Sequence, residues 1–270
     1  VLGHPVRHSL SPAMQNAALA ARNLDALYLA FDVPPQRLAP TLALLAELGF
    51  MGVNLTVPLK EIAFQNIQSL DESAQRLGSV NTVKFTPQGP QGFSTDGEGF
   101  LRAIGELWDL QLRARALFIL GCGGAGRAVA IAAALAGANL SLADRDQARA
   151  EKLRQELTAL GIQAQSVDAA AWPAASRQAE LVINATPQGL QAGEASPLPP
   201  SAFRAGQWVY DLIYTLPETP LMRIANQQGA ITANGLGMLL HQGALAFQIW
   251  TGQEPPLAVM RRALEQGLRP

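Results

Sequence analysis

The chain has 270 residues, of which 49% are hydrophobic and 15% charged, a composition that suits one large or two ordinary packed domains and excludes a disordered chain. Its 20 basic and 21 acidic residues leave a formal charge of −1 without a basic stripe, which argues against nucleic acid as a partner. The longest apolar runs, such as residues 128–136, are too short to span a membrane, so no membrane partner is expected. One cysteine, Cys122, excludes an intrachain disulfide, and with no recognisable signal peptide we expect a cytoplasmic protein.

Strand-like apolar runs alternate with helix-like segments through most of the chain, the pattern of an α/β protein with parallel sheets. A helix is predicted over residues 97–108, with Asp96 as its N-cap. Before it, we predict strands over residues 27–33, 52–56 and 80–85, and helices over residues 12–22 and 36–48.

The sequence pattern changes at residue 116. A strand over residues 116–120 runs into a glycine-rich loop, an alanine-rich helix and a second strand over residues 139–143, which together form one βαβ unit. Further strands are predicted over residues 180–185 and 208–214, and the tail over residues 235–270 is mostly helical. We therefore expect a first domain and a dinucleotide-binding domain, with the C-terminal helices packing back on the first.

Residues 121–126 read GCGGAG, which satisfies the pattern GxGxxG between a predicted strand and a predicted helix. The first glycine permits a tight turn, the second lets a diphosphate touch the backbone, and the third lets the helix pack on the strand. Free N–H groups and the dipole at the start of the helix would hold the diphosphate. The sequence thus predicts a cofactor-binding loop of Gly121, Cys122, Gly123, Gly124 and Ala125.

Charged residues follow the second strand of this βαβ unit. Asp144 comes 23 residues after Gly121, where an acid bonds the ribose hydroxyls of the cofactor and favours NAD. Arg145 could instead clamp the 2′-phosphate of NADP, while Asp146 adds negative charge beside it. All three are predicted to contact the cofactor, and the choice between NADP and NAD stays open at this point.

Small polar and charged residues gather near the predicted strand ends of the first domain. Ligands of open α/β sheets bind outside the carboxyl ends of the strands. Hydroxyls, amides, one amine and one carboxylate suit a small, polyhydroxylated, anionic substrate, and Lys60 with Asp96 would form an ion pair able to exchange a proton with a substrate hydroxyl. Ser11, followed by Pro12, also fits a helix N-cap. The members of this set are Asn54, Thr56, Lys60, Asn81 and Asp96.

Several stretches form an ordered set of motifs. GHPVRHSLSP (3–12) matches the pattern G-x-P-x-x-H-S-x-S-P, and VNLTVPLK (53–60) is similar to N-V-T-x-P-x-K. GSVNT (78–82), STDGEG (94–99) and GCGGAGRA (121–128) are similar to G-A-V-N-T, N-T-D-x-x-G and G-A-G-G-A-x-R-A. NATPQG (184–189) and NGLGMLLHQGALAF (234–247) complete the series. In this order the set is highly specific, and the chain resembles the shikimate dehydrogenase family from Gly3 to its C-terminal helices.

The resemblance implies a fold and a reaction. The fold would consist of an open mixed α/β domain for substrate binding and catalysis at residues 1–96, a Rossmann-type NADP-binding domain at 97–235, and C-terminal helices at 236–270 packing on the substrate domain. The reaction would be the reversible, NADPH-dependent reduction of 3-dehydroshikimate to shikimate. It belongs to the biosynthesis of chorismate and the aromatic amino acids.

The resemblance also implies roles for particular residues. Ser9 and Ser11 would bind the substrate carboxylate, and Lys60 would be catalytic together with Asp96. Because a carboxylate favours the charged form of a neighbouring lysine, Lys60 is expected to act as a positioned acid or donor more than as a base. The full set implied to bind substrate is Ser9, Ser11, Asn54, Thr56, Lys60, Asn81, Asp96, Tyr214 and Gln242. Outside the glycine loop and the charged stretch, the residues implied to contact the cofactor are Glu72, Thr186, Ile213, Gly235 and Gly237.

The sequence departs from the family pattern at a few positions, which keeps alternatives open. Gln15 and Ser94 stand where the family usually has His and Asn, and residues 144–146 replace the Asn-Arg-Thr of NADP users. An NAD-preferring quinate/shikimate dehydrogenase is therefore the alternative, followed by a non-catalytic ligand-binding regulator of the same fold. We expect a monomer or homodimer.

The histidines are predicted to bind no metal, because the sequence offers no second set of ligands beside them. His8 is expected to be structural. The three histidines are His4, His8 and His241.

Overall fold

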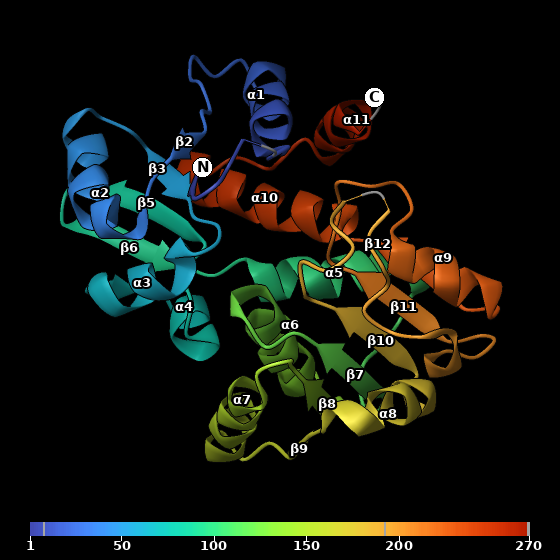
Figure 1. The fold of residues 1–270 in the computed structure, drawn as a ribbon. Helices are drawn as coiled ribbons and strands as arrows, with labels where there is room; N and C mark the ends of the chain where they lie inside the picture. Colours follow the sequence, from blue (N-terminus) through green and yellow to red (C-terminus); the bar gives the residue numbers. More distant parts are fainter. Residues whose placement is uncertain (8, 192, 269–270) are drawn as a thin grey trace. The chain divides into compact units, whose positions relative to one another are not determined.

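The computed structural model describes residues 1–7, 9–191 and 193–268, and these form two compact units. Unit 1 comprises Val1–Phe100 and the described residues from Leu239 onward, and unit 2 comprises Leu101–Met238. The chain passes between the units within two helices, α5 (Asp96–Trp108) and α10 (Leu236–Thr251) (Figure 1).

Unit 1 contains a mixed sheet with the strand order β3-β5-β6-β4. Both β3–β5 and β5–β6 are antiparallel, whereas β4–β6 is parallel, so the sheet of this unit is mixed, as the resemblance implied, and not parallel throughout. The tight turn between β5 and β6 explains the difference, because only antiparallel strands can be joined by so short a connection. The strands are β3 (Gly52–Asn54), β4 (Ser69–Leu70), β5 (Thr82–Thr86) and β6 (Gly89–Phe93).

A short parallel pair, β1 (Leu2–Gly3) and β2 (Phe31–Asp32), lies beside this sheet, and a bridge joins Leu2 to Leu55 just after β3. The strand predicted over residues 27–33 is therefore much shorter in the structure. Its partner β1 offers only two residues for pairing, and the rest of the segment forms no strand, with Leu27 exposed and Tyr28 and Val33 buried.

Helices cover the strands of unit 1. The core contains Val53, Leu59 and Val83. The last helix, α11, lies against α1, so the C-terminal helices return to this unit (Figure 1). The helices, apart from the two that connect the units, are α1 (Ser11–Ala21), α2 (Leu38–Glu47), α3 (Leu59–Asn66), α4 (Glu72–Leu77) and α11 (Leu257–Gly267).

Unit 2 is a doubly wound parallel sheet with the strand order β12-β11-β10-β7-β8-β9, which is the arrangement of dinucleotide-binding folds. The predicted bounds of β7 and β8 are confirmed. The strands are β7 (Ala116–Leu120), β8 (Asn139–Ala143), β9 (Ala164–Ser166), β10 (Leu181–Asn184), β11 (Trp208–Asp211) and β12 (Ile231–Asn234). The remaining helices of the unit are α6 (Gly124–Leu135), α7 (Gln147–Ala159), α8 (Trp172–Gln178) and α9 (Pro220–Gln227).

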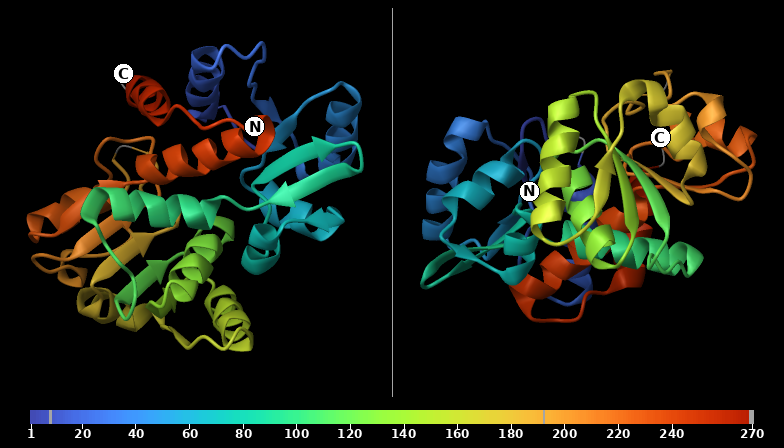
Figure 2. Two further views of the ribbon diagram at one scale, coloured as in Figure 1. Left: turned by 180° about the vertical axis from the view of Figure 1, so that it is seen from behind. Right: turned by 90° about the horizontal axis from the view of Figure 1, so that it is seen from below.

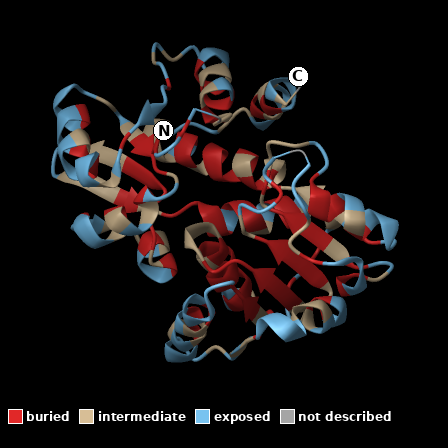
Figure 3. Cartoon of the chain, in the orientation of Figure 1, coloured by how far each residue is buried: buried red, intermediate tan, exposed pale blue. Residues whose placement is uncertain are grey.

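The strands of unit 2 form the buried layer of a three-layer sandwich. Right-handed crossovers place α7 and α8 on opposite faces of the sheet, as the right-hand view of Figure 2 shows. Because both faces are covered, β7 and β10 are buried along nearly their whole length, and their apolar residues do not alternate with polar ones (Figure 3). The strand order reverses between β7 and β10, and ligands of such sheets bind at that point, beyond the carboxyl ends of the strands.

Among the described residues, no helix combines the length and the apolar character needed to cross a bilayer.

Candidate active site

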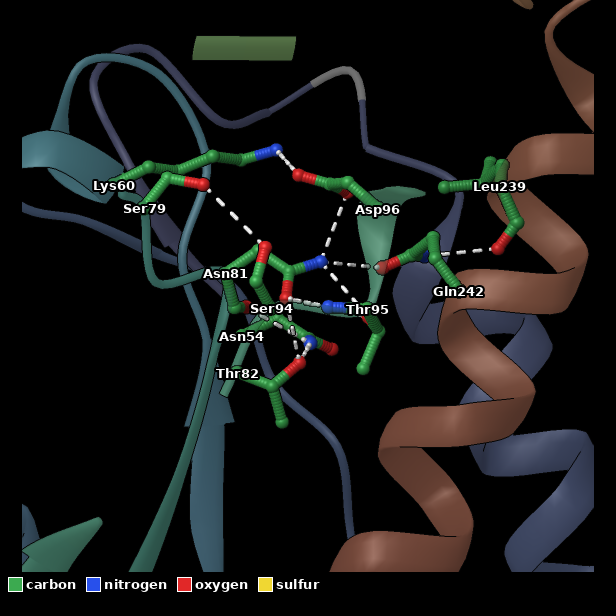
Figure 4. Close-up of polar contacts among 10 residues, drawn as sticks. All are labelled: Asn54, Lys60, Ser79, Asn81, Thr82, Ser94, Thr95, Asp96, Leu239 and Gln242. Carbon is green, nitrogen blue, oxygen red and sulfur yellow. Dashed lines mark hydrogen bonds and ion pairs between the residues drawn. The ribbon is translucent and has the colours of Figure 1, made fainter. Parts of the chain in front are cut away.

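A lysine and an aspartate form an ion pair at the start of two helices of unit 1. Lys60 is the second residue of α3 and Asp96 the first of α5, and the Lys60 Nζ donates to Asp96 Oδ2 over 2.6 Å (Figure 4). Their side chains are 13% and 5% exposed, so the pair is largely withdrawn from water. The N-cap predicted for Asp96 is wrong, since this residue lies inside the helix and its carboxylate turns to Lys60.

Asn81 lies at the centre of the polar contacts around this pair. Its Nδ2 donates to Asp96 Oδ1 over 2.9 Å and to Thr95 Oγ1 over 2.9 Å, while its Oδ1 accepts from the Thr95 N–H over 2.8 Å. The Asn81 side chain is only 1% exposed. Asn81 therefore orients the Asp96 carboxylate, which in turn holds the Lys60 ammonium.

Helix α10 contributes Gln242 to the same cluster. Its Oε1 accepts from Asn81 Nδ2 over 3.3 Å, and its Nε2 donates to the Leu239 carbonyl within the helix (Figure 4). Gly99 of α5 permits this approach, because a Cβ at that position would lie 2.8 Å from the backbone N of Gln242. We call Lys60, Asn81, Asp96 and Gln242 the polar cluster.

Asn54 lies beside the polar cluster and is not one of its members. Its Oδ1 accepts from the Tyr28 hydroxyl over 2.6 Å, and its Nδ2 donates to Thr82 Oγ1 and to the Asn81 carbonyl. The amide of Asn54 is thus engaged at both ends while the residue is 6% exposed. These bonds fix the backbone that carries Asn81, and a direct contact of Asn54 with substrate stays a prediction.

The other hydroxyls predicted to bind substrate belong to Thr56, Ser9 and Ser11. Thr56 stands beside Gly3, where a Cβ would lie 2.4 Å from the Thr56 Cγ2, so a side chain at position 3 would displace that of Thr56. Ser9 Oγ accepts from the Ser11 N–H over 3.3 Å. The N-cap of α1 is Leu10, so Ser11 is already inside the helix and its predicted capping role is wrong.

The glycine loop of unit 2 has the shape that a diphosphate requires. Gly121 has φ +101°, and a Cβ at Gly126 would lie 1.8 Å from the Gly121 carbonyl oxygen, so both positions need glycine. At Gly123, by contrast, an added Cβ would meet nothing within 4 Å, and no side chain caps the helix that follows. The loop therefore leaves open space in front of the N–H groups at the start of α6, and it fits a diphosphate.

The Asp144 carboxylate stabilises this loop from the end of β8. Asp144 Oδ2 accepts from the Cys122 N–H over 2.7 Å, Oδ1 accepts from the Asp146 N–H over 2.9 Å, and the residue is 9% exposed. Burial, with the Asp144 charge second, raises the pKa of the Cys122 thiol to about 12, so the thiol stays neutral. Asp146 caps α7 by accepting from the Ala148 N–H, and Arg145 is exposed beside it.

The remaining predicted cofactor residues of unit 2 follow the strands on the other side of the sheet. Thr186 donates through its hydroxyl to Asn184, and the Ile213 carbonyl accepts from the Gly235 N–H over 3.0 Å. A Cβ at Gly237 would lie 3.2 Å from Ala103. These residues gather at one edge of the sheet, as a ligand site there requires.

Tyr214 and Glu72 are the last of the predicted site residues. Burial raises the pKa of Tyr214, which belongs to unit 2. Glu72 opens α4 in unit 1, is exposed and pairs with Arg76 one turn later. The roles assigned to both stay predictions.

The described histidines have protein partners or a buried position. His4 Nδ1 bonds with Asp32 over 2.5 Å, and His241 is 8% exposed. Within residues 1–7, 9–191 and 193–268, no group of histidine, cysteine and acidic residues is arranged to hold a metal ion. The structural role predicted for His8 lies outside the described residues.

Sequence reasoning missed a buried carboxylate in unit 2. Asp211 ends β11, is 0% exposed, and accepts from Asn184, Ile213 and Thr219. The usable signal was an acid at the carboxyl end of an apolar strand, in the segment that also carries Tyr214.

The doubly wound sheet with its glycine loop and the separate unit with its lysine–aspartate pair define a two-domain, dinucleotide-dependent dehydrogenase. Residues 1–83 match the family model "Shikimate dehydrogenase substrate binding domain", and residues 235–265 match "Shikimate 5′-dehydrogenase C-terminal domain".

Curated relatives match the chain from end to end. Shikimate dehydrogenase (NADP(+)) of Methanopyrus kandleri is 44% identical over 100% of this chain and 95% of the relative. The enzyme of the same name from Moorella thermoacetica is 46% identical over 99% and 92%. The crystal structure of shikimate 5-dehydrogenase from Thermus thermophilus in complex with NADP(H) and shikimate has a TM-score of 0.89 at 40% identity, covering 98% and 97% of the two chains. The chain belongs to the shikimate dehydrogenase family.

Proposed function

We propose that the protein catalyses the reversible, NADPH-dependent reduction of 3-dehydroshikimate to shikimate, as an NADP-dependent oxidoreductase acting on a CH–OH group. Family membership with relatives named shikimate dehydrogenase (NADP(+)) supports the reaction. The observation in this chain that carries the proposal is the withdrawn Lys60–Asp96 ion pair, held by Asn81. The reaction belongs to chorismate and aromatic amino acid biosynthesis.

Lys60 is the proposed proton donor in the direction of reduction. Its ammonium can hydrogen-bond the substrate oxygen while Asp96 holds it in place, and it delivers the proton as the carbonyl becomes an alcohol. In the reverse direction the same nitrogen takes up the hydroxyl proton. When bound, NADPH supplies the hydride.

The polar cluster and the hydroxyls near it suit the rest of the substrate. Shikimate carries hydroxyls and one carboxylate, and amides such as Gln242 bind hydroxyls as both donor and acceptor. Ser9 and Ser11 would hold the carboxylate at the start of α1, where the helix N–H groups favour negative charge. The domain roles follow: unit 1 binds substrate and carries catalysis, and unit 2 binds the dinucleotide.

The charged stretch after β8 is compatible with NADP. Both carboxylate oxygens of Asp144 already accept backbone N–H groups, so this acid serves the loop and is less available to a ribose than the sequence alone suggests. Arg145 is exposed and would pair with a 2′-phosphate. The NAD-preferring quinate alternative is therefore not favoured.

A matrix of two cofactors and two substrates tests the proposal. Oxidation of shikimate and of quinate is followed with NADP⁺ and with NAD⁺ through the absorbance of reduced nicotinamide. We expect the highest kcat/KM for shikimate with NADP⁺. A higher value for quinate with NAD⁺ would establish the alternative, and binding of shikimate without turnover would establish a non-catalytic regulator.

Cellular location and assembly are part of the same proposal. A cytoplasmic monomer or homodimer agrees with a chain that has a single, buried cysteine. Cell fractionation and light scattering of the purified protein test these two points.

A further inference from the structure

Three strands of unit 2 end in polar residues that lie side by side. Asn184 of β10 pairs in register with Asp211 of β11, which pairs with Asn234 of β12. Each is the last residue of its strand. Because residues in register point to the same face of a sheet, the three side chains form one row, which we call the edge row.

Each member of the edge row binds the loop that follows its own strand. Asn184 Oδ1 accepts from the Thr186 N–H over 3.1 Å. Asp211 Oδ1 accepts from the Ile213 N–H over 3.1 Å, and Asn234 Oδ1 accepts from the Leu236 N–H over 3.2 Å.

Asp211 also joins neighbouring elements, and so does Asn234, whose Nδ2 donates to the Leu216 carbonyl in the loop after β11. Its Oδ1 accepts from Asn184 Nδ2 over 2.9 Å, and its Oδ2 accepts from Thr219 Oγ1 over 2.7 Å, at the start of α9. Through Ile213, whose carbonyl accepts from Gly235, the loop after β11 is tied to the end of β12 as well. Asp211 thus connects three loops that are far apart in the sequence.

A carboxylate suits the three donors at this position. An ionised aspartate accepts at both oxygens and donates nothing, whereas asparagine has one acceptor oxygen and would have to reverse the hydrogen bond with the Thr219 hydroxyl. The carboxylate is 0% exposed, the groups that bond to it are neutral, and burial raises the pKa of Asp211 to about 6. Burying such a group without a cation is unfavourable, so the carboxylate joins the loops at the expense of some of the free energy of unfolding.

The position of the edge row assigns it to one half of the dinucleotide. The glycine loop after β7 takes the diphosphate, and the stretch after β8 takes the adenosine ribose. The strands on the other side of the switch point, β10 to β12, are left for the nicotinamide half. The loops that Asp211 joins carry Thr186, Ile213 and Gly235, the residues predicted to contact the cofactor there.

We propose that Asp211 is a positioning residue for the nicotinamide half of the cofactor: without touching the cofactor, it fixes the backbone after β10, β11 and β12 that receives this half. The inference rests on the proposed function, since it presupposes a bound dinucleotide.

The test is to measure, by calorimetry, the affinities of variants of the full chain for two ligands. NADP⁺ contains both halves of the cofactor, and adenosine 2′,5′-bisphosphate contains only the adenosine half. Asp211→Ala is expected to weaken NADP⁺ binding by about tenfold or more and to leave the bisphosphate within about twofold, because only the nicotinamide loops lose their anchor. Asp211→Asn keeps one acceptor oxygen and is expected to lie between wild type and Asp211→Ala.

Gln207→Ala is the matched control. Gln207 is also 0% exposed and hydrogen-bonds the Ser176 and Ala179 carbonyls, but it precedes β11 at the opposite edge of the sheet. Its loss is expected to lower the melting temperature without changing the ratio of the two affinities. Hydrogen exchange should become faster at Thr186 and Ile213 in Asp211→Asn, a measurement that does not need the alanine variant to fold.

The outcomes separate the two proposals. If wild type binds neither ligand, the proposed function fails. If wild type binds both, and the Asp211 variants leave the affinity ratio and the exchange at Thr186 and Ile213 unchanged, Asp211 is merely structural and the inference is overturned.

Discussion

The polar cluster of unit 1 and the sheet edge of unit 2 use carboxylates in opposite ways. In the cluster, Asp96 pairs with a cation, Lys60, and both side chains are proposed to serve the reaction themselves. At the sheet edge, Asp144 and Asp211 accept from backbone N–H groups and neutral side chains. At the sheet edge the carboxylates fix the backbone conformation of the loops, and it is this backbone that is proposed to contact the dinucleotide.

Substitutions in the two regions should have different effects. A side chain that meets the reacting atoms affects kcat, whereas a carboxylate that shapes a loop affects cofactor affinity and stability. The two regions should therefore respond to matched changes in different measurements.

Lys60→Ala should have the largest effect. We expect kcat for shikimate oxidation to fall by about a thousandfold with little change in KM, because the proton-transfer group is lost while the other polar contacts remain. Steady-state kinetics measure both constants.

Lys84→Ala is the control for Lys60→Ala, since Lys84 lies on β5 of the same unit and is only partly buried. It should leave kcat unchanged. If Lys60→Ala kept its kcat and only raised KM, Lys60 would be a binding group and the cluster would not differ in kind from the sheet edge.

The pH dependence of stability should distinguish Asp211 from Glu180, which lie at opposite edges of the sheet of unit 2. Burial raises the pKa of Asp211 from 3.8 to about 6, so the folded state holds this proton more tightly than the unfolded state. The free energy of unfolding of wild type, relative to Asp211→Asn, should therefore rise as the pH falls through this window, by at most roughly 3 kcal/mol at 1.36 kcal/mol per pKa unit.

Glu180→Gln should show the opposite sign. Its hydrogen bond with Arg115 lowers the pKa of Glu180, so the stabilisation is present at neutral pH and is lost as the pH falls through the lowered value. Urea unfolding across the acidic range measures both differences. Parallel curves for the two variants would contradict the view that Asp211 is an unfavourably buried charge.

Local chemistry made the glycine loop predictable, because strand, turn and helix N-terminus all lie within residues 116–135. The contacts of Asp211 could not be predicted in this way. Its partners Asn184 and Thr219 come close only through the strand register and the path of the loop after β11, and residue spacing in the sequence reveals neither. Asn81 is an intermediate case: its position near a strand end was readable, but its contact with Gln242, 161 residues later, required the fold. The strand predicted over residues 27–33 was too long because extended, apolar sequence does not reveal how little partner strand is present.

Gly123→Ala tests whether the backbone at the sheet edge receives the ligand. Its φ of −75° suits alanine and the added Cβ meets nothing within 4 Å, so the free energy of unfolding should change little. NADP⁺ affinity should fall by about tenfold, because the methyl group occupies space in front of the helix N-terminus where the diphosphate binds.

Gly105→Ala is the control for Gly123→Ala, because its Cβ also meets nothing within 4 Å, but it lies within α5. There alanine should stabilise the helix by about 0.5–1 kcal/mol and leave NADP⁺ affinity unchanged. Unchanged affinity in Gly123→Ala as well would mean that the loop does not bind the diphosphate.

The smallest expected effects come from one chemical change made in both regions. Tyr28→Phe removes the hydroxyl that donates to Asn54 Oδ1, and Tyr210→Phe removes the hydroxyl that accepts from the Met238 N–H over 3.0 Å. Each leaves a buried polar group without that partner, so each should lower the free energy of unfolding by about 1–2 kcal/mol.

The kinetics of the two phenylalanine variants should nevertheless differ. Tyr210 holds the start of α10 next to Gly237, so Tyr210→Phe should raise the KM for NADP⁺ by about two- to fivefold, while Tyr28→Phe should leave the KM for shikimate within about twofold. A larger rise in the shikimate KM of Tyr28→Phe would show that Asn54 is held for direct contact with substrate. The amide of Asn54 would then act in substrate binding, like the polar cluster, and would not serve only to support the backbone of Asn81.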